Sequence, residues 1–202
     1  MNKLRKKNLN LLKKSGVYHE SMEHDACGVG LVASTDGKKS RKVVEYGIQA
    51  LKAVWHRGAI DADGKTGDGA GIHIEIPSDF FIEKIEATGH KHDDSEVCVG
   101  MLFLPRNNYS AQEECRSIVE SELTKSNFNI YGWRQVPVDP SVLGETAESN
   151  RPEITQVLFK HNTKEEKGKK LEIKLYEARR KIEKKILEAN FCLLYTSDAA
   201  DE

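Results

Sequence analysis

Cys27-Gly28-Val29-Gly30 lies near the start of the chain, and a second glycine-rich run, Thr66-Gly67-Asp68-Gly69-Ala70-Gly71, follows it. Between the two lies His56-Arg57-Gly58. Glycine lets backbone amides approach a ligand closely, because it has no side chain to obstruct them. A cysteine that became the amino-terminal residue would carry both a nucleophile, its thiol, and a base, its α-amine. These stretches therefore indicate a reactive site built around Cys27.

The composition of the 202-residue chain suits one domain with appendages. Its 31 basic and 32 acidic residues nearly cancel, so the net charge offers no general case for binding nucleic acid. The sequence has no apolar stretch of about 20 residues, the length of a membrane-spanning helix. Its 4 cysteines show no Cys-x-x-Cys pairing, which argues against zinc and redox motifs and favours reduced thiols in a cytoplasmic protein.

The two ends of the chain are interpreted as appendages. Residues 1–26 are rich in lysine, and we expect them to be a leader or propeptide. Their apolar run Leu9–Leu12 is too short for the core of a secretory signal, while an organelle-targeting leader and a start at Met22 stay open as alternatives. Residues 191–202 are interpreted as a tail of doubtful origin.

The first elements of the domain are expected to be strand, helix and strand. A short strand is expected over 28–33. Residues 41–55 carry apolar side chains at the spacing of a helix face. Residues 70–77 alternate between apolar and polar side chains, which predicts a half-buried strand that ends at Pro77. Ser78 is then expected to cap the next helix.

The later part of the chain is expected to add strands and helices around one more fully covered strand. Residues 96–104 are apolar on both faces, so a strand there requires layers above and below it. A charged stretch with apolar residues at helical spacing predicts an amphipathic helix with a solvated face. The expected elements are a polar loop at 88–96, a helix around 115–123, strands at 131–138 and 154–159, a long connection at 139–153, and the amphipathic helix at 164–189.

Two further groups of reactive residues are given structural interpretations. Cys98 and Cys115 lie in apolar periodic segments, where a cysteine is usually a small buried side chain. The polar loop holds a cluster without the context that orients metal ligands, so we expect a solvated loop and predict no metal site. Its members are His90, His92, Asp93 and Asp94.

Three runs together carry a resemblance to a known family. They are His24-Asp25-Ala26-Cys27-Gly28-Val29-Gly30, Trp55-His56-Arg57-Gly58-Ala59 and Thr66-Gly67-Asp68-Gly69-Ala70-Gly71-Ile72. These runs resemble the amino-terminal glutaminase domain of glutamate synthase large subunits, a class II glutamine amidotransferase domain of the amino-terminal nucleophile hydrolase superfamily. The first two runs are shared across class II amidotransferases, whereas the third, with the cleavable leader, points to glutamate synthase.

The resemblance implies an α+β fold, a four-layer αββα sandwich over residues 27–190 that is incomplete at its carboxyl end. It places Cys27 at the nucleophile position, where its thiolate attacks the side-chain amide of L-glutamine and its own α-amine accepts the proton. Arg57 and Gly58, with Asp68 and Gly69, match positions that line the active site and bind substrate. His56 is interpreted as scaffold, because the amine already supplies the base.

The resemblance also implies partners for this chain. Ammonia would pass to 2-oxoglutarate in the remaining synthase domains of the same polypeptide, an NADPH- or ferredoxin-dependent enzyme with FMN, an iron–sulfur cluster and, in some forms, a small reductase subunit. No cofactor is expected in the present chain. The family's oxyanion-hole asparagine-glycine pair is expected beyond residue 202, so the chain alone is expected to be inactive. The alternatives are another class II amidotransferase, such as the phosphoribosyl pyrophosphate type, and a non-catalytic fragment.

Overall fold

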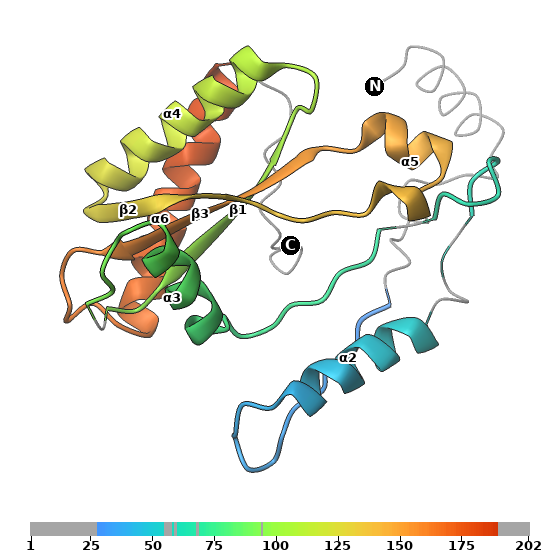
Figure 1. Cartoon of the computed structure of the whole chain (residues 1–202), viewed down its shortest axis with the longest axis horizontal. Helices are drawn as coiled ribbons and strands as arrows, with labels where there is room; N and C mark the ends of the chain where they lie inside the picture. Colours follow the sequence, from blue (N-terminus) through green and yellow to red (C-terminus); the bar gives the residue numbers. More distant parts are fainter. Residues whose placement is uncertain (1–27, 55–57, 59, 68, 94, 190–202) are drawn as a thin grey trace, which may run out of the picture. The chain divides into compact units, whose positions relative to one another are not determined.

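The computed structural model describes residues 28–54, 58, 60–67, 69–93 and 95–189 (Figure 1). These residues belong to two compact units. The first unit takes its described residues from 28–60 and 67–73, and the second takes them from 61–66 and 74–189.

The first unit is built on helix α2 (Arg41–Ala53). Its N-cap is Ser40, whose side chain accepts a hydrogen bond from the backbone N–H of Lys42 at 3.2 Å. The helix confirms the expectation for 41–55, although it ends at Ala53. The side chain of Ile72 lies against this helix, since a Cβ at Gly47 would come within 3.2 Å of the Ile72 Cδ1.

Two expected strands do not form in the described part of the chain. Residues 28–34 and 69–77 have no strand structure, so the predictions of strands at 28–33 and 70–77 are wrong. Val29 is 92% exposed. A strand is stable only beside a neighbour that completes its hydrogen-bond ladder, and within the described residues neither segment has one.

Helix α3 (Ser78–Ala87) opens the main part of the second unit. Pro77 stands at its N-cap and Ser78 is its first residue, so the prediction that Ser78 caps the helix is wrong. Proline suits a helix start, where its missing N–H has no helical partner to lose. The helix buries Phe81 and Ile85.

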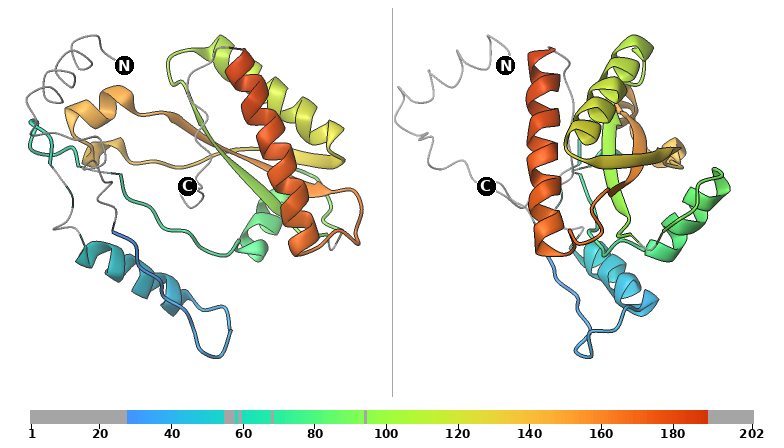
Figure 2. Two further views of the ribbon diagram at one scale, coloured as in Figure 1. Left: turned by 180° about the vertical axis from the view of Figure 1, so that it is seen from behind. Right: turned by 90° about the vertical axis from the view of Figure 1, so that its left-hand side faces the viewer.

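A three-stranded antiparallel sheet forms the centre of the second unit. Its strands β1 (Cys98–Leu104), β2 (Phe128–Gln135) and β3 (Glu153–His161) lie in the order β1-β3-β2. Helices α4 (Tyr109–Lys125) and α6 (Lys169–Glu188) cover one face of the sheet, and α3 lies on the other, as the edge-on view at the right of Figure 2 shows. The fold is therefore α+β, as expected.

Two apolar clusters hold these layers together. The larger lies between the sheet and helices α4 and α6, and includes Leu102, Leu104, Cys115, Val119, Leu123, Phe128, Val157, Phe159, Leu171, Ile182 and Ile186. The smaller lies between the sheet and α3, and consists of Phe81, Ile85, Val97, Tyr131 and Leu158. Side chains of β1 contribute to both, since Leu102 belongs to the larger cluster and Val99 packs against the smaller one. This confirms that the strand expected at 96–104 is covered on both faces.

Strand β2 contains an irregularity that decides where its side chains point. Its register against β3 shifts between Ile130 and Gly132, which leaves Tyr131 as an extra residue. Because of this extra residue, Ile130 and Trp133 both pack against the larger cluster, whereas Tyr131 between them is buried in the smaller one. The strand runs over 128–135 rather than the expected 131–138.

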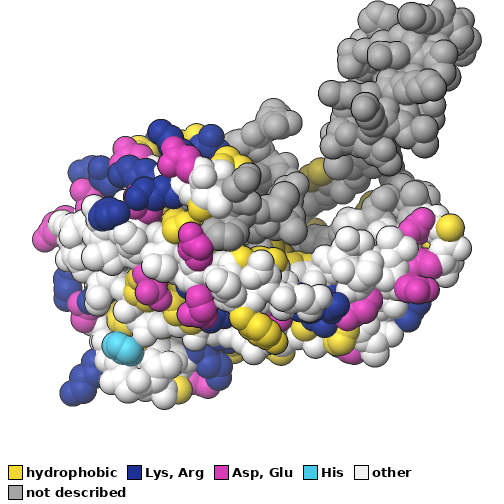
Figure 3. Space-filling view, turned by 90° about the horizontal axis from the view of Figure 1, so that it is seen from above, with side chains coloured by type: hydrophobic (Ala, Val, Ile, Leu, Met, Phe, Trp, Pro, Cys, Tyr) yellow, Lys and Arg dark blue, Asp and Glu magenta, His cyan; other side chains and the backbone are white. Residues whose placement is uncertain are grey.

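The expected helices on the outer face are confirmed. Helix α6 is the amphipathic helix predicted at 164–189, and α4 contains the helix predicted around 115–123. The buried carboxylate of Glu122 on α4 accepts hydrogen bonds from Lys185 of α6 at 2.8 Å and from Lys125 at 2.9 Å. On the face seen in Figure 3, basic and acidic side chains lie next to one another. Among the described helices, none combines the length and the apolar character needed to cross a membrane.

Candidate active site

The structure describes only part of the sequence-predicted site. Cys27, Arg57 and Asp68 lie outside the described residues, so their roles stay predictions. Gly58 and Gly69 are described, and both are exposed. A Cβ at Gly69 would meet no described atom within 4 Å. A ligand can therefore approach the backbone closely at this position, as expected for a glycine-rich run.

A tight turn, Asp61–Thr66, ends at the first residue of the glycine-rich run. The backbone N–H of Asp61 donates to the carbonyl of Thr66 at 2.7 Å and closes the turn. From inside the turn, Asp63 Oδ1 accepts from the backbone N–H of Lys65 at 2.9 Å and of Thr66 at 2.7 Å. An aspartate that binds the amides following it is a common way to fix a turn.

Both oxygens of the Asp63 carboxylate are engaged. Oδ2 accepts from the hydroxyl of Thr66 and from the backbone N–H of Thr146, the latter at 3.3 Å. The hydrogen bond from the Thr66 hydroxyl, with those from the turn amides, holds the pKa of Asp63 well below its usual range. The carboxylate is therefore ionised at neutral pH and serves to hold backbone, with no oxygen left free of a hydrogen bond.

The connection between β2 and β3 contains two short helices, η3 (Pro140–Val142) and α5 (Glu145–Asn150). Helix α5 is tied to the chain that follows β1, because Glu148 pairs with both Arg106 and Arg151. Arg151 and Arg106 hold the pKa of Glu148 below its usual range. These ion pairs fix the position of α5 relative to the sheet.

The turn also supplies the cap of α5. The backbone N–H of Thr146 donates to Asp63, and that of Ala147 donates to the Thr66 hydroxyl at 3.2 Å. These amides lie in the first turn of the helix, where no carbonyl of the helix itself can accept them. The N-cap residue, Gly144, has no side chain to do so. The Asp63 and Thr66 side chains thus satisfy the exposed end of a helix about 80 residues away.

The sequence placed Thr66 in the glycine-rich run but predicted no structural contact for it, and it predicted no role for Asp63 or Gly144. The Asp63-Gly64 pair is a turn signal, and Gly64 does adopt a positive φ of 70°. The partner of the turn, however, is distant in sequence, and a local pattern carries no information about such a contact.

The described cysteines are unsuited to nucleophilic chemistry. Cys98 and Cys115 are free thiols, only 2% and 1% exposed. Burial raises the pKa of Cys98 to about 12 and also raises the pKa of Cys115. A thiol that keeps its proton is a poor nucleophile. This confirms the prediction that both pack as small apolar side chains.

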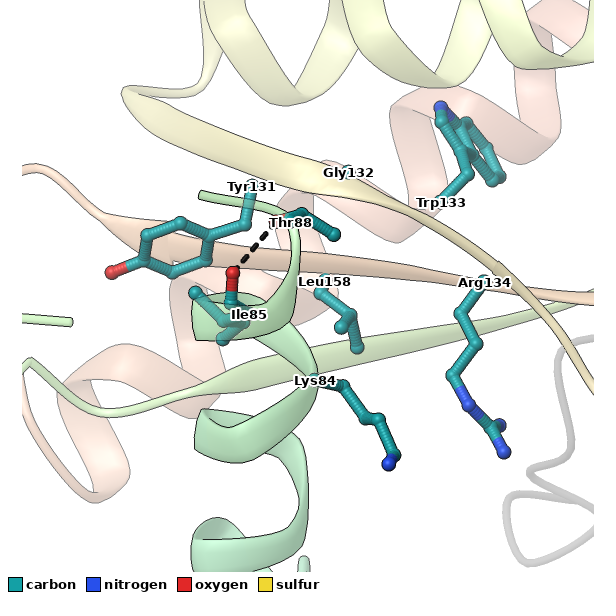
Figure 4. A pocket seen from close by; sticks show the side chains of 8 residues that line it. All are labelled: Lys84, Ile85, Thr88, Tyr131, Gly132, Trp133, Arg134 and Leu158. Carbon is teal, nitrogen blue, oxygen red and sulfur yellow. Dashed lines mark hydrogen bonds between the residues drawn. The ribbon is translucent and has the colours of Figure 1, made fainter. Parts of the chain in front are cut away.

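A pocket of about 200 Å³ lies between α3 and β2 (Figure 4). Two cations, Lys84 and Arg134, lie on one side of it. Lys84 pairs with Glu83 at 2.8 Å, and Arg134 donates to Gln156 at 2.6 Å. Both cations also lie over the ring of Phe80. Because its charged groups are engaged within the protein, we assign this pocket no part in the chemistry.

The polar loop after α3 is fastened to β3 rather than freely solvated, which corrects the expectation for it. Asp93 accepts from Lys160 of β3 at 2.6 Å and from Ser95 at 2.7 Å, and these hydrogen bonds hold its pKa well below the usual range. His90 lies edge-on to the ring of Tyr131. Within the described ranges, no three His, Cys, Asp or Glu side chains gather in a way that would hold a metal ion.

Comparison with known proteins shows where the chain belongs. Residues 27–198 match the family described as Glutamine amidotransferases class-II. The chain is 51% identical over 175 residues to the glutamate synthase (NADPH) large chain of Azospirillum brasilense, which covers 87% of this chain and 12% of the relative. It is 41% identical over 165 residues to the ferredoxin-dependent glutamate synthase of Cyanidium caldarium, which covers 81% of this chain and 10% of the relative.

A yeast protein shows the same relationship. The chain is 38% identical over 151 residues to the glutamate synthase (NADH) of Saccharomyces cerevisiae, which covers 72% of this chain and 7% of the relative. The chain thus spans about a tenth of the length of the curated relatives it matches. The family match takes in most of the chain and has Cys27 as its first residue. The chain belongs to the class II glutamine amidotransferases.

Proposed function

We propose that this chain is the glutaminase portion of a glutamate synthase, which hydrolyses L-glutamine to glutamate and ammonia. The observation that carries the proposal is the identity of 51% over 87% of the chain to a glutamate synthase large chain. The named relatives include NADPH-, ferredoxin- and NADH-dependent glutamate synthases, so this chain is similar to glutamate synthases with different electron donors. The names of these relatives support the glutamate synthase assignment over the phosphoribosyl pyrophosphate type of amidotransferase.

The proposed nucleophile is Cys27, after removal of residues 1–26 has given it a free α-amine. The amine takes the thiol proton, and the thiolate attacks the side-chain amide carbon of glutamine. The two groups have ordinary pKa values of about 8 and about 8.5, so this transfer is nearly balanced at neutral pH. The proton then goes to the departing nitrogen as ammonia leaves. Water hydrolyses the resulting glutamyl thioester, releases glutamate and restores the thiol.

The supporting residues are proposed by their match to the family signatures. Arg57 would stabilise negative charge at the thiolate, and Asp68 would bind the substrate. Gly58 and Gly69 would leave space for the substrate to approach the backbone, which is consistent with the exposure of both. Cys98 and Cys115 are excluded from the nucleophile role by their burial.

The remaining chemistry is assigned to other parts of the polypeptide. Ammonia would pass to 2-oxoglutarate in the synthase domains, and a small reductase subunit would deliver electrons in some forms. The described residues do not fit FMN or an iron–sulfur cluster. Cys98 and Cys115 are both buried in the apolar core, whereas a cluster needs several converging thiolates. The pocket of about 200 Å³ is smaller than a typical cofactor site. We also propose a cytoplasmic, reducing location, from the two free thiols.

The complete domain is proposed to be a four-layer αββα sandwich. The sheet β1-β3-β2, with α4 and α6 on one face, supports one half of it. A second sheet would form the other half of the sandwich. Ile72, Ile74 and Ile76 are 46%, 43% and 37% exposed, and such a sheet would bury them.

The amino terminus of the mature full-length enzyme tests the mechanism. We expect intact-mass measurement and amino-terminal sequencing to find Cys27 as the first residue, because the α-amine must be free to act as the base. An active enzyme that retains residues 1–26 would contradict the mechanism.

A further inference from the structure

The turn Asp61–Thr66 is anchored on the connection between β2 and β3. Beyond the two hydrogen bonds to α5, the Nζ of Lys65 donates to the carbonyl of Ser141 at 3.0 Å. The three contacts join residues 76 to 83 positions apart in the chain. A surface turn does not need this many distant contacts to close, because Asp63 already closes it from within.

Gly144 makes the close approach of the turn possible. It is buried, and a Cβ there would lie closer than 3.0 Å to Thr66 Oγ1, Asp63 Oδ2 and the Thr66 backbone nitrogen. Its φ of −77° is open to any residue, so space rather than backbone conformation requires glycine. Because one of the three colliding atoms is backbone, a side chain at Gly144 would have to move the turn itself.

The hydrogen bonds of Asp63, Lys65 and Thr66 to the β2–β3 connection, called the anchor below, are linked to the sheet through α5. Arg106, two residues after β1, pairs with Glu148 of α5, and the first amides of α5 bind Asp63 and Thr66. A line of contacts therefore runs from the end of β1 through α5 to Thr66. A peptide bond then joins Thr66 to Gly67, the first glycine of the run.

We propose that Asp63, Thr66 and Gly144 are positioning residues for glutamine hydrolysis, which fix the point where the glycine-rich run begins. This rests on the proposed function, in which that run lines the glutamine site. Glycines have no side chains with which to hold the run in place and lose much conformational freedom on ordering. The contacts at Thr66 order the start of the run before glutamine binds. Without them, part of the binding energy of glutamine goes into ordering the run, so KM rises.

Variants of the full-length enzyme test this role. Thr66→Val keeps the shape of the side chain but removes the oxygen that accepts from Ala147 and donates to Asp63, whereas Thr66→Ser keeps that oxygen. Gly144→Ala displaces the turn by a steric clash and leaves the chemistry of Asp63 and Thr66 unchanged. The matched control is Asp36→Asn, because Asp36 also accepts hydrogen bonds from Ser34 and Lys38 within an exposed turn, and its hydrogen bonds among the described residues are local.

The readouts are KM and kcat for glutamine hydrolysis, with glutamate synthesis from added ammonia as an internal measure of intact enzyme. We expect Thr66→Val and Gly144→Ala to raise KM for glutamine about tenfold, the equivalent of one or two net hydrogen bonds. Their ammonia-dependent synthesis should stay within about twofold of wild type. Thr66→Ser should restore KM to within about twofold, and Asp36→Asn should leave it unchanged.

Two different failures are distinguishable. If the Cys27→Ala variant hydrolyses glutamine at the wild-type rate, the proposed function is wrong, and so is the positioning role. If hydrolysis depends on Cys27 but KM is unchanged in Thr66→Val and Gly144→Ala, the positioning role alone is wrong. Equal loss of glutamine-dependent and ammonia-dependent activity in these variants, or no recovery in Thr66→Ser, would also overturn it, because either result indicates general damage to the fold.

Discussion

Helix α6 offers a matched pair of leucines for measuring how much the larger apolar cluster contributes to stability. Leu171 is 1% exposed and belongs to that cluster, whereas Leu187 on the same helix is 75% exposed. Leu171→Ala removes three buried carbon atoms at about 0.8 kcal/mol each and leaves a cavity, for a total loss of about 3 kcal/mol. Leu187→Ala should cost less than about 0.5 kcal/mol. Both substitutions replace leucine with alanine in the same helix and so change the helix propensity equally. The difference between the two variants therefore measures the contribution of burial to stability.

Hydrogen exchange followed by mass spectrometry measures this difference in the full-length enzyme as well as in the isolated chain. Peptides from α4, α6 and β2 report the opening of the layer that contains the cluster. A loss of about 3 kcal/mol corresponds to exchange about a hundredfold faster in the Leu171→Ala variant. Leu187→Ala should match wild type. Equal effects of the two variants, or no effect of Leu171→Ala on α4 and β2, would refute the packing of α6 described here.

The remaining predictions concern charge and thiol reactivity. Lysines, Lys185 first, hold the pKa of Glu122 below its usual range, so the stabilisation it provides is present above the ordinary glutamate pKa and is lost as pH falls through the lowered one. Exchange in α4 and α6 should therefore be several-fold faster in Glu122→Gln than in wild type at pH 7, a difference of about 1 kcal/mol, and the two proteins should converge as pH falls below the lowered pKa. Glu113→Gln, at an exposed pair on α4, should have little effect. A difference between Glu122→Gln and wild type that persists at low pH would exclude the ion pair as the cause. Cys98 and Cys115 should resist iodoacetamide at pH 8 until the protein is unfolded in urea, as peptide mass mapping can show, because burial raises their pKa values; rapid labelling of either in the folded protein would contradict their placement in the core.

Helices of the fold were predictable from the sequence, because their signal is local. The apolar spacing in 41–55 and 164–189 is a pattern within one short stretch of chain, and α2 and α6 form there. Strands depend on partners that may be distant, which explains the opposite outcomes at 154–159 and 70–77. The first is the central strand β3, with neighbours on both sides, whereas the second alternates correctly but has no neighbour among the described residues.

The details that the sequence did not predict share the same cause. The extra residue at Tyr131 depends on how β2 pairs with β3, and the strand begins and ends three residues earlier than predicted. The attachment of Thr66 to α5 depends on a residue 81 positions away. The candidate nucleophile is the reverse case. Its role was predicted from the motif around Cys27, which lies outside the described residues. An activity measurement is therefore needed to test that role.

Cys27→Ala in the full-length enzyme tests the central claim most directly, because it separates the production of ammonia from its use. Glutamate synthesis is measured with glutamine and, in parallel, with added ammonia as the nitrogen source. We expect the variant to lose glutamine-dependent synthesis by several orders of magnitude, since the nucleophile is gone, while ammonia-dependent synthesis stays near the wild-type rate. Retained glutamine-dependent synthesis, or equal loss of both activities, would contradict the assignment of Cys27 as the glutaminase nucleophile.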